Sequence, residues 1–333
     1  MTVTALDASP TQQPIAGQGT GRPLKIFSGS ASPGLAAEIA GLLGLPVGPV
    51  KIANFADGEI YVQIQESVRG ADVFLVQPIC HPVNYNLVEL CILLDAFKRA
   101  SVHQVTAVIP YFAYARQDRK AQGREAITSK LVADLLTTAG ASRVVCLDLH
   151  APQIQGFFDI NSDHLYATPV LARWMEQKRK SDREMVIVSP DVGGVSRARV
   201  YAKKLDAPIA IVDKRRPKHN IAEVMSVIGD VRDKTAVIVD DMIDTAGTLT
   251  EVARLLVREG AAEVYAAATH GLLSGPALER LAESPILELA ITNSIPLEPS
   301  RRLDKITVLS VADLLAQAIG RIHEDLSVSM LFE

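Results

Sequence analysis

The sequence predicts an α/β protein in which helices flank mostly parallel β-sheets. Short apolar runs alternate with amphipathic segments along nearly the whole chain, an order typical of strands and helices that follow one another. Most of these runs are continuous and rich in β-branched residues, as expected of parallel strands buried on both faces. A chain of 333 residues is also too long for one ordinary core. We therefore expect two similar domains, each with its own sheet.

The predicted strands are the apolar runs themselves. They lie at Lys25–Ser28, Val73–Gln77, Val105–Pro110, Val144–Asp148, Val186–Ser189, Ile209–Asp213, Ala236–Asp240, Val264–Ala268, Leu287–Thr292 and Ile306–Leu309. Helical patterns separate them. Between Leu87 and Leu94, leucine and cysteine occupy positions i, i+3, i+4 and i+7, which gives one apolar stripe. A second stripe, from Val252 to Leu256, is followed by Gly260, a typical glycine after a helix end.

The domain boundaries follow from shifts in composition. Residues 1–23 are rich in Thr, Gln, Gly, Ala and Pro without periodicity, so we expect a disordered tail. A segment rich in Gly, Asp and Asn lies between the fourth and fifth strands. It favours an N-terminal α/β domain at residues 24–166 and a C-terminal α/β domain at residues 167–305. The last segment, residues 306–333, is a candidate to join the N-terminal domain.

Composition and charge narrow the class of protein. The hydrophobic fraction of 48% and the charged fraction of 22% are those of a globular protein. The net charge of −4 gives no reason to expect a nucleic-acid partner. No stretch approaches the ~18 apolar residues of a membrane span, and the tail lacks a signal-peptide pattern, so a cytoplasmic location is expected. Cys80, Cys91 and Cys146 lie in apolar stretches, which predicts buried thiols in a reducing compartment.

The sharpest motif follows the predicted strand at Ala236–Asp240. Two adjacent carboxylates, Asp240 and Asp241, close that strand, and ligands of open α/β sheets bind at this end. A turn of small residues then opens a helix, where backbone N–H groups and two hydroxyls suit a phosphate. The turn consists of Asp244, Thr245, Ala246, Gly247 and Thr248. Carboxylates are poor phosphate ligands but good acceptors for hydroxyls. The motif therefore predicts a cradle for a sugar phosphate, since a simple N-capped helix leaves the paired acids unexplained.

Two loops in the first half have both a functional and a structural interpretation. In the segment 54–59, Phe55 could stack on a purine while Asp57 and Glu59 accept from its amine, but Asp-Gly is also common in hairpin turns. In the segment 111–125, the residues after a strand are aromatic and then basic. They include Arg116, Gln117, Asp118 and Arg119. Such a segment is either a solvated loop or a mobile arm whose arginines close over a triphosphate.

Two further strand ends carry polar residues. Asp148 and His150 close one strand, and Asp191 follows another before two glycines. Mg²⁺ prefers oxygen ligands and keeps several waters, so on chemistry alone His150 is a polar site residue and Asp191 the better metal ligand. A basic run from Lys214 to Arg216 follows the strand at Ile209–Asp213. Adjacent cations at a strand end are either a solvated edge or a clamp on charge that develops during phosphoryl transfer.

Taken together and in this order, these segments resemble the ribose-phosphate pyrophosphokinase family. The sugar-phosphate motif alone is shared with phosphoribosyltransferases, which consume the compound that the pyrophosphokinases make. The segment 54–59 is close to the ATP-binding loop of the pyrophosphokinases, and the likeness runs from Lys25 to Phe332. It implies two domains like the type I phosphoribosyltransferase fold. It also implies transfer of pyrophosphate from ATP to the C1 hydroxyl of ribose 5-phosphate, giving 5-phosphoribosyl 1-diphosphate and AMP for nucleotide biosynthesis.

The resemblance also implies roles for single residues. Lys214 and Arg216 would stabilise the transferring group, and His150 with Asp191 would hold the Mg²⁺ of Mg–ATP. The ATP site would comprise Phe55, Asp57, Glu59, Arg116, Gln117, Asp118 and Arg119. Two alternatives are a phosphoribosyltransferase and a catalytically silent regulatory subunit of the same family. The first does not predict an ATP loop, and the second would be expected to have lost residues of the arm or the lysine.

Members of this family assemble as hexamers and respond to phosphate and ADP. The resemblance therefore implies a homo-oligomer activated by phosphate, with Ser67, Arg69 and Ser310 as candidates to bind the regulatory anion. For the first two, a plain turn before the strand at Val73–Gln77 is the structural alternative. Many relatives have serine where this chain has Pro78. Proline offers neither an N–H nor a hydroxyl to an anion, so altered regulation is expected.

Overall fold

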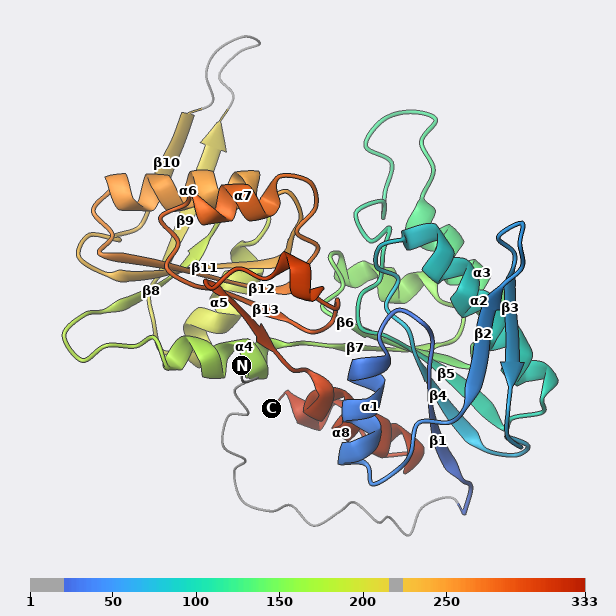
Figure 1. Ribbon diagram of the computed structural model, residues 1–333. Helices are drawn as coiled ribbons and strands as arrows, with labels where there is room; N and C mark the ends of the chain where they lie inside the picture. Colours follow the sequence, from blue (N-terminus) through green and yellow to red (C-terminus); the bar gives the residue numbers. More distant parts are fainter. Residues whose placement is uncertain (1–20, 216–223, 333) are drawn as a thin grey trace.

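Two sheets flanked by helices make up the part of the chain that the computed structural model describes, residues 21–215 and 224–332 (Figure 1). The strands are β1 (Leu24–Ser28), β2 (Val50–Asn54), β3 (Ile60–Ile64), β4 (Asp72–Val76), β5 (Gln104–Ile109), β6 (Arg143–Leu147), β7 (Asn161–Leu165), β8 (Met185–Ser189), β9 (Ile209–Arg215), β10 (Val224–Ile228), β11 (Thr235–Ile243), β12 (Glu263–Gly271), β13 (Leu289–Thr292) and β14 (Ile306–Leu309). The α-helices are α1 (Pro33–Leu42), α2 (Val83–Arg99), α3 (Thr128–Ala139), α4 (Thr168–Glu176), α5 (Val195–Lys204), α6 (Gly247–Arg258), α7 (Ala277–Ala282) and α8 (Ala312–His323).

The first sheet has the strand order β1-β4-β5-β6-β7, and all of its neighbouring pairs are parallel. The second has the order β10-β9-β8-β11-β12-β13-β14 and is parallel except for the β9–β10 pair. A separate antiparallel hairpin joins β2 to β3. The predicted fold class is confirmed: each predicted apolar run coincides with a strand. Parallel strands need helical crossovers, which is why helices cover the faces of both sheets.

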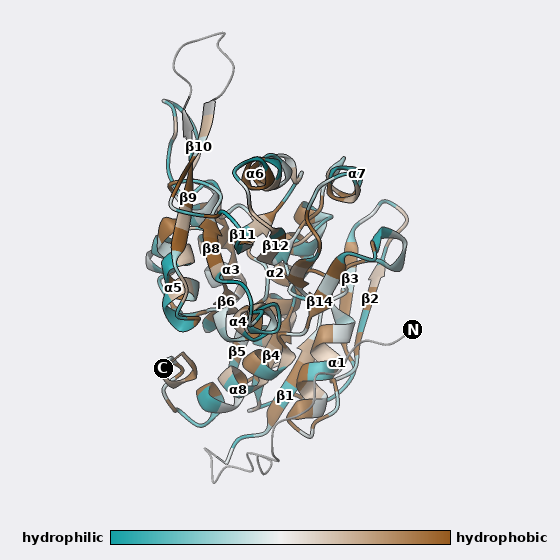
Figure 2. Ribbon diagram, turned by 90° about the vertical axis from the view of Figure 1, so that its left-hand side faces the viewer, coloured by the Kyte–Doolittle hydropathy of each residue, from teal (hydrophilic) through white to brown (hydrophobic). Residues whose placement is uncertain are grey.

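Burial accounts for the continuous apolar runs. All five residues of β4 and of β8 are buried, and hydrophobic residues gather in the strands of both sheets (Figure 2). One buried cluster joins the two halves, with Leu165 of β7, Trp174 of α4, Val237 of β11 and Ile319 of α8 among its members. Burial of apolar surface stabilises a protein by roughly 25 cal/mol per Å². Because residues of both halves share this cluster, its burial favours one arrangement of the two sheets.

The C-terminal segment contacts both halves of the molecule. β14 pairs with β13 in the second sheet, whereas α8 packs against α1 beside the first sheet (Figure 1). The chain therefore returns to its first half after completing the second sheet.

Four strands were not predicted from the sequence. β2 and β3 are mostly half-exposed, β7 is a polar strand, and β10 pairs only at the sheet edge. None of these four has the continuous apolar run that predicts a strand buried on both faces. β7 is held by parallel pairing with β6 and by an ion pair of 2.6 Å between Arg143 and Asp163.

Cys80 and Cys146 are buried, as predicted, but Cys91 is only partly so. Burial raises the pKa of the Cys80 thiol to about 11, so it stays protonated at neutral pH.

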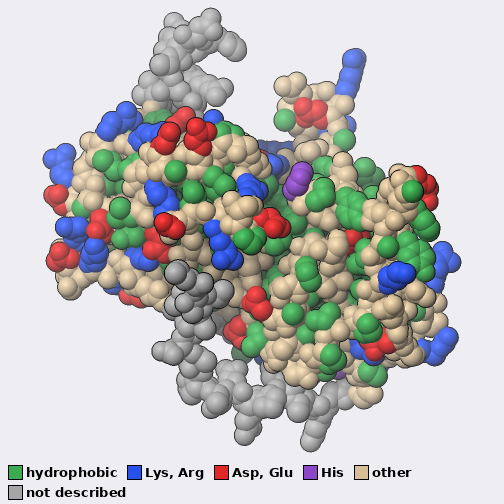
Figure 3. All heavy atoms as spheres, in the orientation of Figure 1, with side chains coloured by type: hydrophobic (Ala, Val, Ile, Leu, Met, Phe, Trp, Pro, Cys, Tyr) green, Lys and Arg blue, Asp and Glu red, His purple; other side chains and the backbone are tan. Residues whose placement is uncertain are grey.

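None of the helices in residues 21–215 and 224–332 is long and apolar enough to cross a membrane. On the face drawn in Figure 3, acidic and basic side chains are interspersed.

Candidate active site

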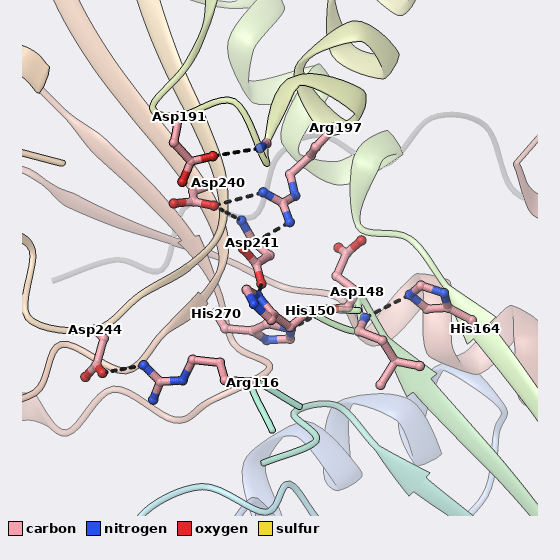
Figure 4. Close-up of polar contacts among 12 residues, drawn as sticks. Arg116, Asp148, His150, His164, Asp191, Arg197, Asp240, Asp241, Asp244 and His270 are labelled. Atoms are coloured by element: carbon pink, nitrogen blue, oxygen red, sulfur yellow. Dashed lines mark hydrogen bonds and ion pairs between the residues drawn. The ribbon is translucent and has the colours of Figure 1, made fainter. Parts of the chain in front are cut away.

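Polar side chains from three strand ends meet where the two sheets face each other (Figure 4). Asp148 and His150 follow β6 of the first sheet, Asp191 follows β8, and Asp240 and Asp241 lie near the end of β11. A cavity of about 750 Å³ adjoins this point, and Asp148, His150 and Asp241 are among its lining residues. That volume lies in the usual range for small-molecule sites. The carboxyl ends of the strands thus form the candidate active site.

The carboxylate pair of β11 is held by one arginine. Nη1 of Arg197 lies 2.8 Å from Oδ1 of Asp240, and Nη2 lies 3.0 Å from Oδ1 of Asp241. Oδ1 of Asp240 also accepts the backbone N–H of Asp241 at 2.8 Å. The Asp240 side chain is 32% exposed and that of Asp241 only 5%, so Asp240 is the more accessible acceptor.

The two carboxylates differ in their proton affinity. Burial, and then the negative charge of Asp241, raise the pKa of Asp240 above its ordinary value. Burial alone would also raise the pKa of Asp241, but a hydrogen bond from His150 and the charge of Arg197 outweigh it and hold that pKa below its usual range. Two negative charges on adjacent residues repel each other, so one carboxylate holds its proton more tightly while the other stays ionised.

His150 connects the first sheet to the second. Its Nδ1 lies 2.6 Å from Oδ2 of Asp241. The hydrogen bond to Asp241 raises the pKa of His150, which favours the imidazolium form. Because Nδ1 contacts the carboxylate, Nε2 is left as the second polar atom of the ring. His150 is 40% exposed, so this ring can meet a ligand that enters the site.

Asp148 is a residue whose role sequence reasoning missed. Its backbone φ is +41°, in the left-handed region that non-glycine residues rarely adopt. Oδ2 of Asp148 accepts the backbone N–H of Ala167 at 2.9 Å and the hydroxyl of Thr269 at 2.6 Å. Its carbonyl oxygen lies 3.2 Å from Nε2 of His270, a buried residue of β12. Asp148 therefore fastens the end of β6 to the second sheet, two residues before His150.

The turn before α6 has the features expected of a phosphate-binding loop. Ala246 precedes the helix with φ +57°, so the chain bends sharply at this point. A Cβ at Gly247 would lie 3.2 Å from Nη1 of Arg280, so the absence of a side chain lets this arginine come close. Arg280 also donates to the carbonyl of Thr245 at 3.0 Å. The start of a 12-residue helix and a nearby guanidinium together favour an anion.

The predicted arm contacts this turn directly. Nη1 of Arg116 lies 2.8 Å from Oδ2 of Asp244. Burial alone would raise the pKa of Asp244, but hydrogen bonds with Arg116 and Ser274 and the charge of Arg116 together hold that pKa below its ordinary value. Gln117 accepts a hydrogen bond from Thr128, and Asp118 accepts one from Gln153. The arm thus brings Arg116 to the sugar-phosphate motif, while the exposed Arg119 extends from it.

The segment 54–59 lies apart from these groups. It forms the turn of the β2–β3 hairpin, where Oδ1 of Asp57 accepts the N–H of Glu59 at 3.1 Å. Phe55 is 56% exposed and makes an edge contact with Tyr61. Figure 1 shows the hairpin at the outer side of the first sheet, away from β11. Within one chain, the structure does not bring this turn to the carboxylates.

The remaining predicted residues have fewer described contacts. Oδ1 of Asp191 accepts the N–H of Gly194, the residue directly before α5, at 2.8 Å. Lys214 lies in β9, its backbone paired with that of Met225. The Lys214 side chain and the whole of Arg216 lie outside the described residues.

The candidates for the regulatory anion lie in two places. Ser67 and Arg69 are exposed between β3 and β4. The Ser310 hydroxyl donates to Glu38 and accepts from the amide of Asn293 at 3.2 Å. Ser310 therefore already has a carboxylate as its partner.

Arg197 is the second residue that sequence reasoning missed. A signal was present, because Arg197 lies six residues after Asp191 and falls in the first turn of α5, the helix that follows Asp191. The sequence does not show which carboxylates Arg197 contacts, because Asp240 lies 43 residues further along the chain.

Comparisons with known proteins agree on one family. A family model described as the N-terminal domain of ribose phosphate pyrophosphokinase matches residues 24–140. A second, described as the phosphoribosyl synthetase-associated domain, matches residues 214–333. The ribose-phosphate pyrophosphokinase of Gloeobacter violaceus is 59% identical over 97% of this chain and 96% of its own length. That of Caldanaerobacter subterraneus is 60% identical over 93% of this chain and 98% of its own. A crystal structure of phosphoribosylpyrophosphate synthetase from Mycobacterium smegmatis superposes with a TM-score of 0.86 at 44% identity, covering 91% of this chain and 100% of the other.

Proposed function

Because this chain belongs to the ribose-phosphate pyrophosphokinase family, we propose that the ends of β6, β8 and β11 form its active site. The chain is an enzyme that transfers pyrophosphate from ATP to ribose 5-phosphate, giving 5-phosphoribosyl 1-diphosphate and AMP. Relatives that are about 60% identical over more than nine-tenths of the chain are named ribose-phosphate pyrophosphokinase. Their names favour this activity over that of a phosphoribosyltransferase or a catalytically silent subunit.

Ribose 5-phosphate is proposed to bind at the end of β11. The turn Asp244–Thr248 would receive the 5-phosphate, because it offers backbone N–H groups at a helix N-terminus. Asp240 and Asp241 would accept hydrogen bonds from the 2- and 3-hydroxyls. One observation carries this proposal: the carboxylate pair held by Arg197 lies beside a turn suited to phosphate. The carboxylates suit the hydroxyls of a sugar phosphate, and the turn suits its phosphate group.

Mg²⁺ is proposed to bind with ATP at His150 and Asp191. When bound, it neutralises charge on the ATP phosphates. Among the described residues, no three His, Cys, Asp or Glu side chains converge on one point, which fits an ion that takes most of its ligands from water and phosphate oxygens. The exposed Asp191 carboxylate suits such a site, and Nε2 of His150 faces away from its contact with Asp241.

ATP is proposed to bind against the arm and the hairpin turn. Arg116 and Arg119 would contact the triphosphate, with Gln117 and Asp118 near the nucleoside. Arg116 must then leave Asp244, its partner in the ion pair. Phe55, Asp57 and Glu59 would contact the purine. Because their turn lies away from β11 in its own chain, we propose that it acts across a contact between two copies in a homo-oligomer, in keeping with the hexamer expected from the sequence.

Lys214 and Arg216 are proposed to act on the transferring group. This reaction forms a bond between the C1 oxygen and the β-phosphorus while the bond from that phosphorus to the α-phosphate oxygen breaks and AMP leaves. Negative charge accumulates on non-bridging oxygens, and fixed cations stabilise that charge better than water does. We also propose that the two α/β domains meet at residues 166–167, that the protein is cytoplasmic and that phosphate activates it. The predicted tail, residues 1–23, lies outside the described residues up to residue 20.

The identity is tested by incubating the protein with ribose 5-phosphate, ATP and MgCl₂. We expect AMP and 5-phosphoribosyl 1-diphosphate to form in equal amounts, as measured by chromatography and ³¹P NMR. Formation of ADP and a phosphorylated sugar would instead show transfer of a single phosphoryl group.

Asp240→Asn is expected to raise the KM for ribose 5-phosphate about tenfold or more. A hydrogen bond to a charged acceptor is worth roughly 1.5–3 kcal/mol, and an amide accepts more weakly. The KM for ATP should change much less. Asp182→Asn serves as the control, because Asp182 is exposed in the loop before β8. Unaltered saturation by ribose 5-phosphate in Asp240→Asn would remove this residue from the sugar site.

Pro78→Ser is expected to lower the phosphate concentration needed for half-maximal activation. Pro78 is buried two residues after the end of β4 and has no donor, whereas serine would supply a hydroxyl and an N–H. Each regained hydrogen bond to an anion corresponds to about a tenfold gain in affinity. The measurement is the initial rate as a function of phosphate, with and without ADP. Superimposable curves for the variant and the parent would mean that Pro78 only shapes the loop.

A further inference from the structure

The adjacent carboxylates of Asp240 and Asp241 require an explanation of their own. Successive residues of a strand direct their side chains to opposite faces of the sheet. Both carboxylates nevertheless contact one guanidinium, and Oδ1 of Asp240 also accepts the N–H of the next residue. Two like charges would separate if no cation lay between them. Arg197 therefore sets how the pair is presented.

The position of Arg197 is fixed by the start of α5. Ala198 and Tyr201 of this helix are buried in the shared core, so the helix cannot shift easily. Gly194 lets the first turn approach closely, because a Cβ at this residue would lie 2.8 Å from Oγ of Ser189. Asp191 accepts the N–H of Gly194 and so fixes the residue directly before the helix. The Arg197 side chain is 27% exposed, so it works from a partly desolvated position.

The contacts continue from Arg197 to the first sheet. Asp241 uses Oδ1 for Arg197 and Oδ2 for Nδ1 of His150. An arginine, a carboxylate and an imidazole thus lie in sequence across the site (Figure 4). A carboxylate held on one side by a guanidinium orients the histidine on its other side. The planar fork of arginine can contact two carboxylates at once, which a lysine ammonium on a flexible stem cannot match.

From these contacts, and resting on the proposed sugar site, we propose that Arg197 is a positioning residue of the reaction. Its guanidinium holds Asp240 and Asp241 in the orientation that accepts the sugar hydroxyls and, through Asp241, sets the ring of His150. In this role Arg197, which also lines the cavity, acts through the two carboxylates. Its removal should therefore weaken the interactions that depend on the hydroxyls and leave the grip on the 5-phosphate in place.

The test compares Arg197→Gln with Arg199→Gln, a control on the same helix whose arginine is exposed. Calorimetry measures the binding of ribose 5-phosphate and of 2-deoxyribose 5-phosphate, without ATP or metal. We expect Arg197→Gln to weaken ribose 5-phosphate about tenfold or more. The loss for the deoxy sugar should be clearly smaller, because one of the supported hydroxyls is missing. Arg199→Gln should bind both sugars as the parent does.

Equal losses for the two sugars, or binding of ribose 5-phosphate as tight as in the parent, would overturn the proposal. Arg197→Lys covers the case in which the glutamine variant fails to fold. It keeps the charge but not the fork, so we expect an intermediate loss with the same dependence on the 2-hydroxyl. Asp240→Asn distinguishes failure of the proposed sugar site from failure of the proposed role of Arg197. If it also binds ribose 5-phosphate normally, the sugar site itself is wrong, whereas a loss confined to Asp240→Asn refutes only the role of Arg197.

Discussion

Lys214→Ala is expected to lower kcat by about 10²–10³-fold while the KM values for ATP and ribose 5-phosphate change little. Removing one preorganised group that stabilises transition-state charge costs on this order. β9, the strand of Lys214, is the neighbour of β8, and Asp191 follows the end of β8. In its proposed role, the charge of Lys214 matters most when negative charge has accumulated on the transferring oxygens. Equal losses in kcat and in kcat/KM identify such an interaction.

Arg215→Ala is the matched control for Lys214→Ala. It removes the same charge from the neighbouring position, to which no role is assigned. Initial rates at saturating and limiting concentrations of each substrate separate kcat from KM. A similar loss in Arg215→Ala would mean that the basic run acts through its total charge. A loss seen only in the KM of one substrate would make Lys214 a binding residue.

Much of the fold could be predicted because parallel strands leave a strong signal. A strand buried on both faces must be apolar at every position, so β4 and β8 are visible as continuous runs. β7 left no such signal. Residues 161–164 of β7 are Asn, Ser, Asp and His, and this strand forms through backbone pairing with β6 and the ion pair of Asp163. A pattern based on hydrophobicity cannot detect stability of that kind.

The candidate site was predictable at the positions where chemistry and chain order coincide. Asp240 and Asp241 stand together at a strand end, and the turn that follows them is contiguous with them in the sequence. Contacts between distant segments could not be predicted. The Arg116–Asp244 pair joins residues 128 positions apart, and the His150–Asp241 pair joins residues 91 apart. Such pairs depend on how the two sheets meet, which shared burial decides.

Asp148→Ala is expected to destabilise the protein by about 3 kcal/mol or more. The carboxylate accepts one hydrogen bond from the Ala167 N–H and one from the Thr269 hydroxyl, and each bond to a charged acceptor is worth roughly 1.5–3 kcal/mol. Alanine is also less tolerant than aspartate of the left-handed conformation at φ +41°. For a protein of this size, we expect the midpoint of thermal unfolding to fall by roughly 4 °C or more. Circular dichroism at a fixed heating rate measures this shift.

Two further variants separate the contribution of the acceptor oxygen from that of the charge. Both hydrogen bonds of Asp148 end on the same oxygen, so the carbonyl oxygen of Asp148→Asn can keep them in weaker form. Asparagine also tolerates a positive φ, so we expect this variant to lose well under half as much stability. Thr269→Val removes one donor and should cost part of the same free energy. Because the two residues share a bond, the double variant Asp148→Ala with Thr269→Val should be less destabilised than the sum of the single variants. If the losses of stability in the two single variants are strictly additive in the double variant, Asp148 does not fasten the end of β6 to β12. If Asp148→Ala unfolds at nearly the same temperature as the parent, these contacts contribute nothing to stability.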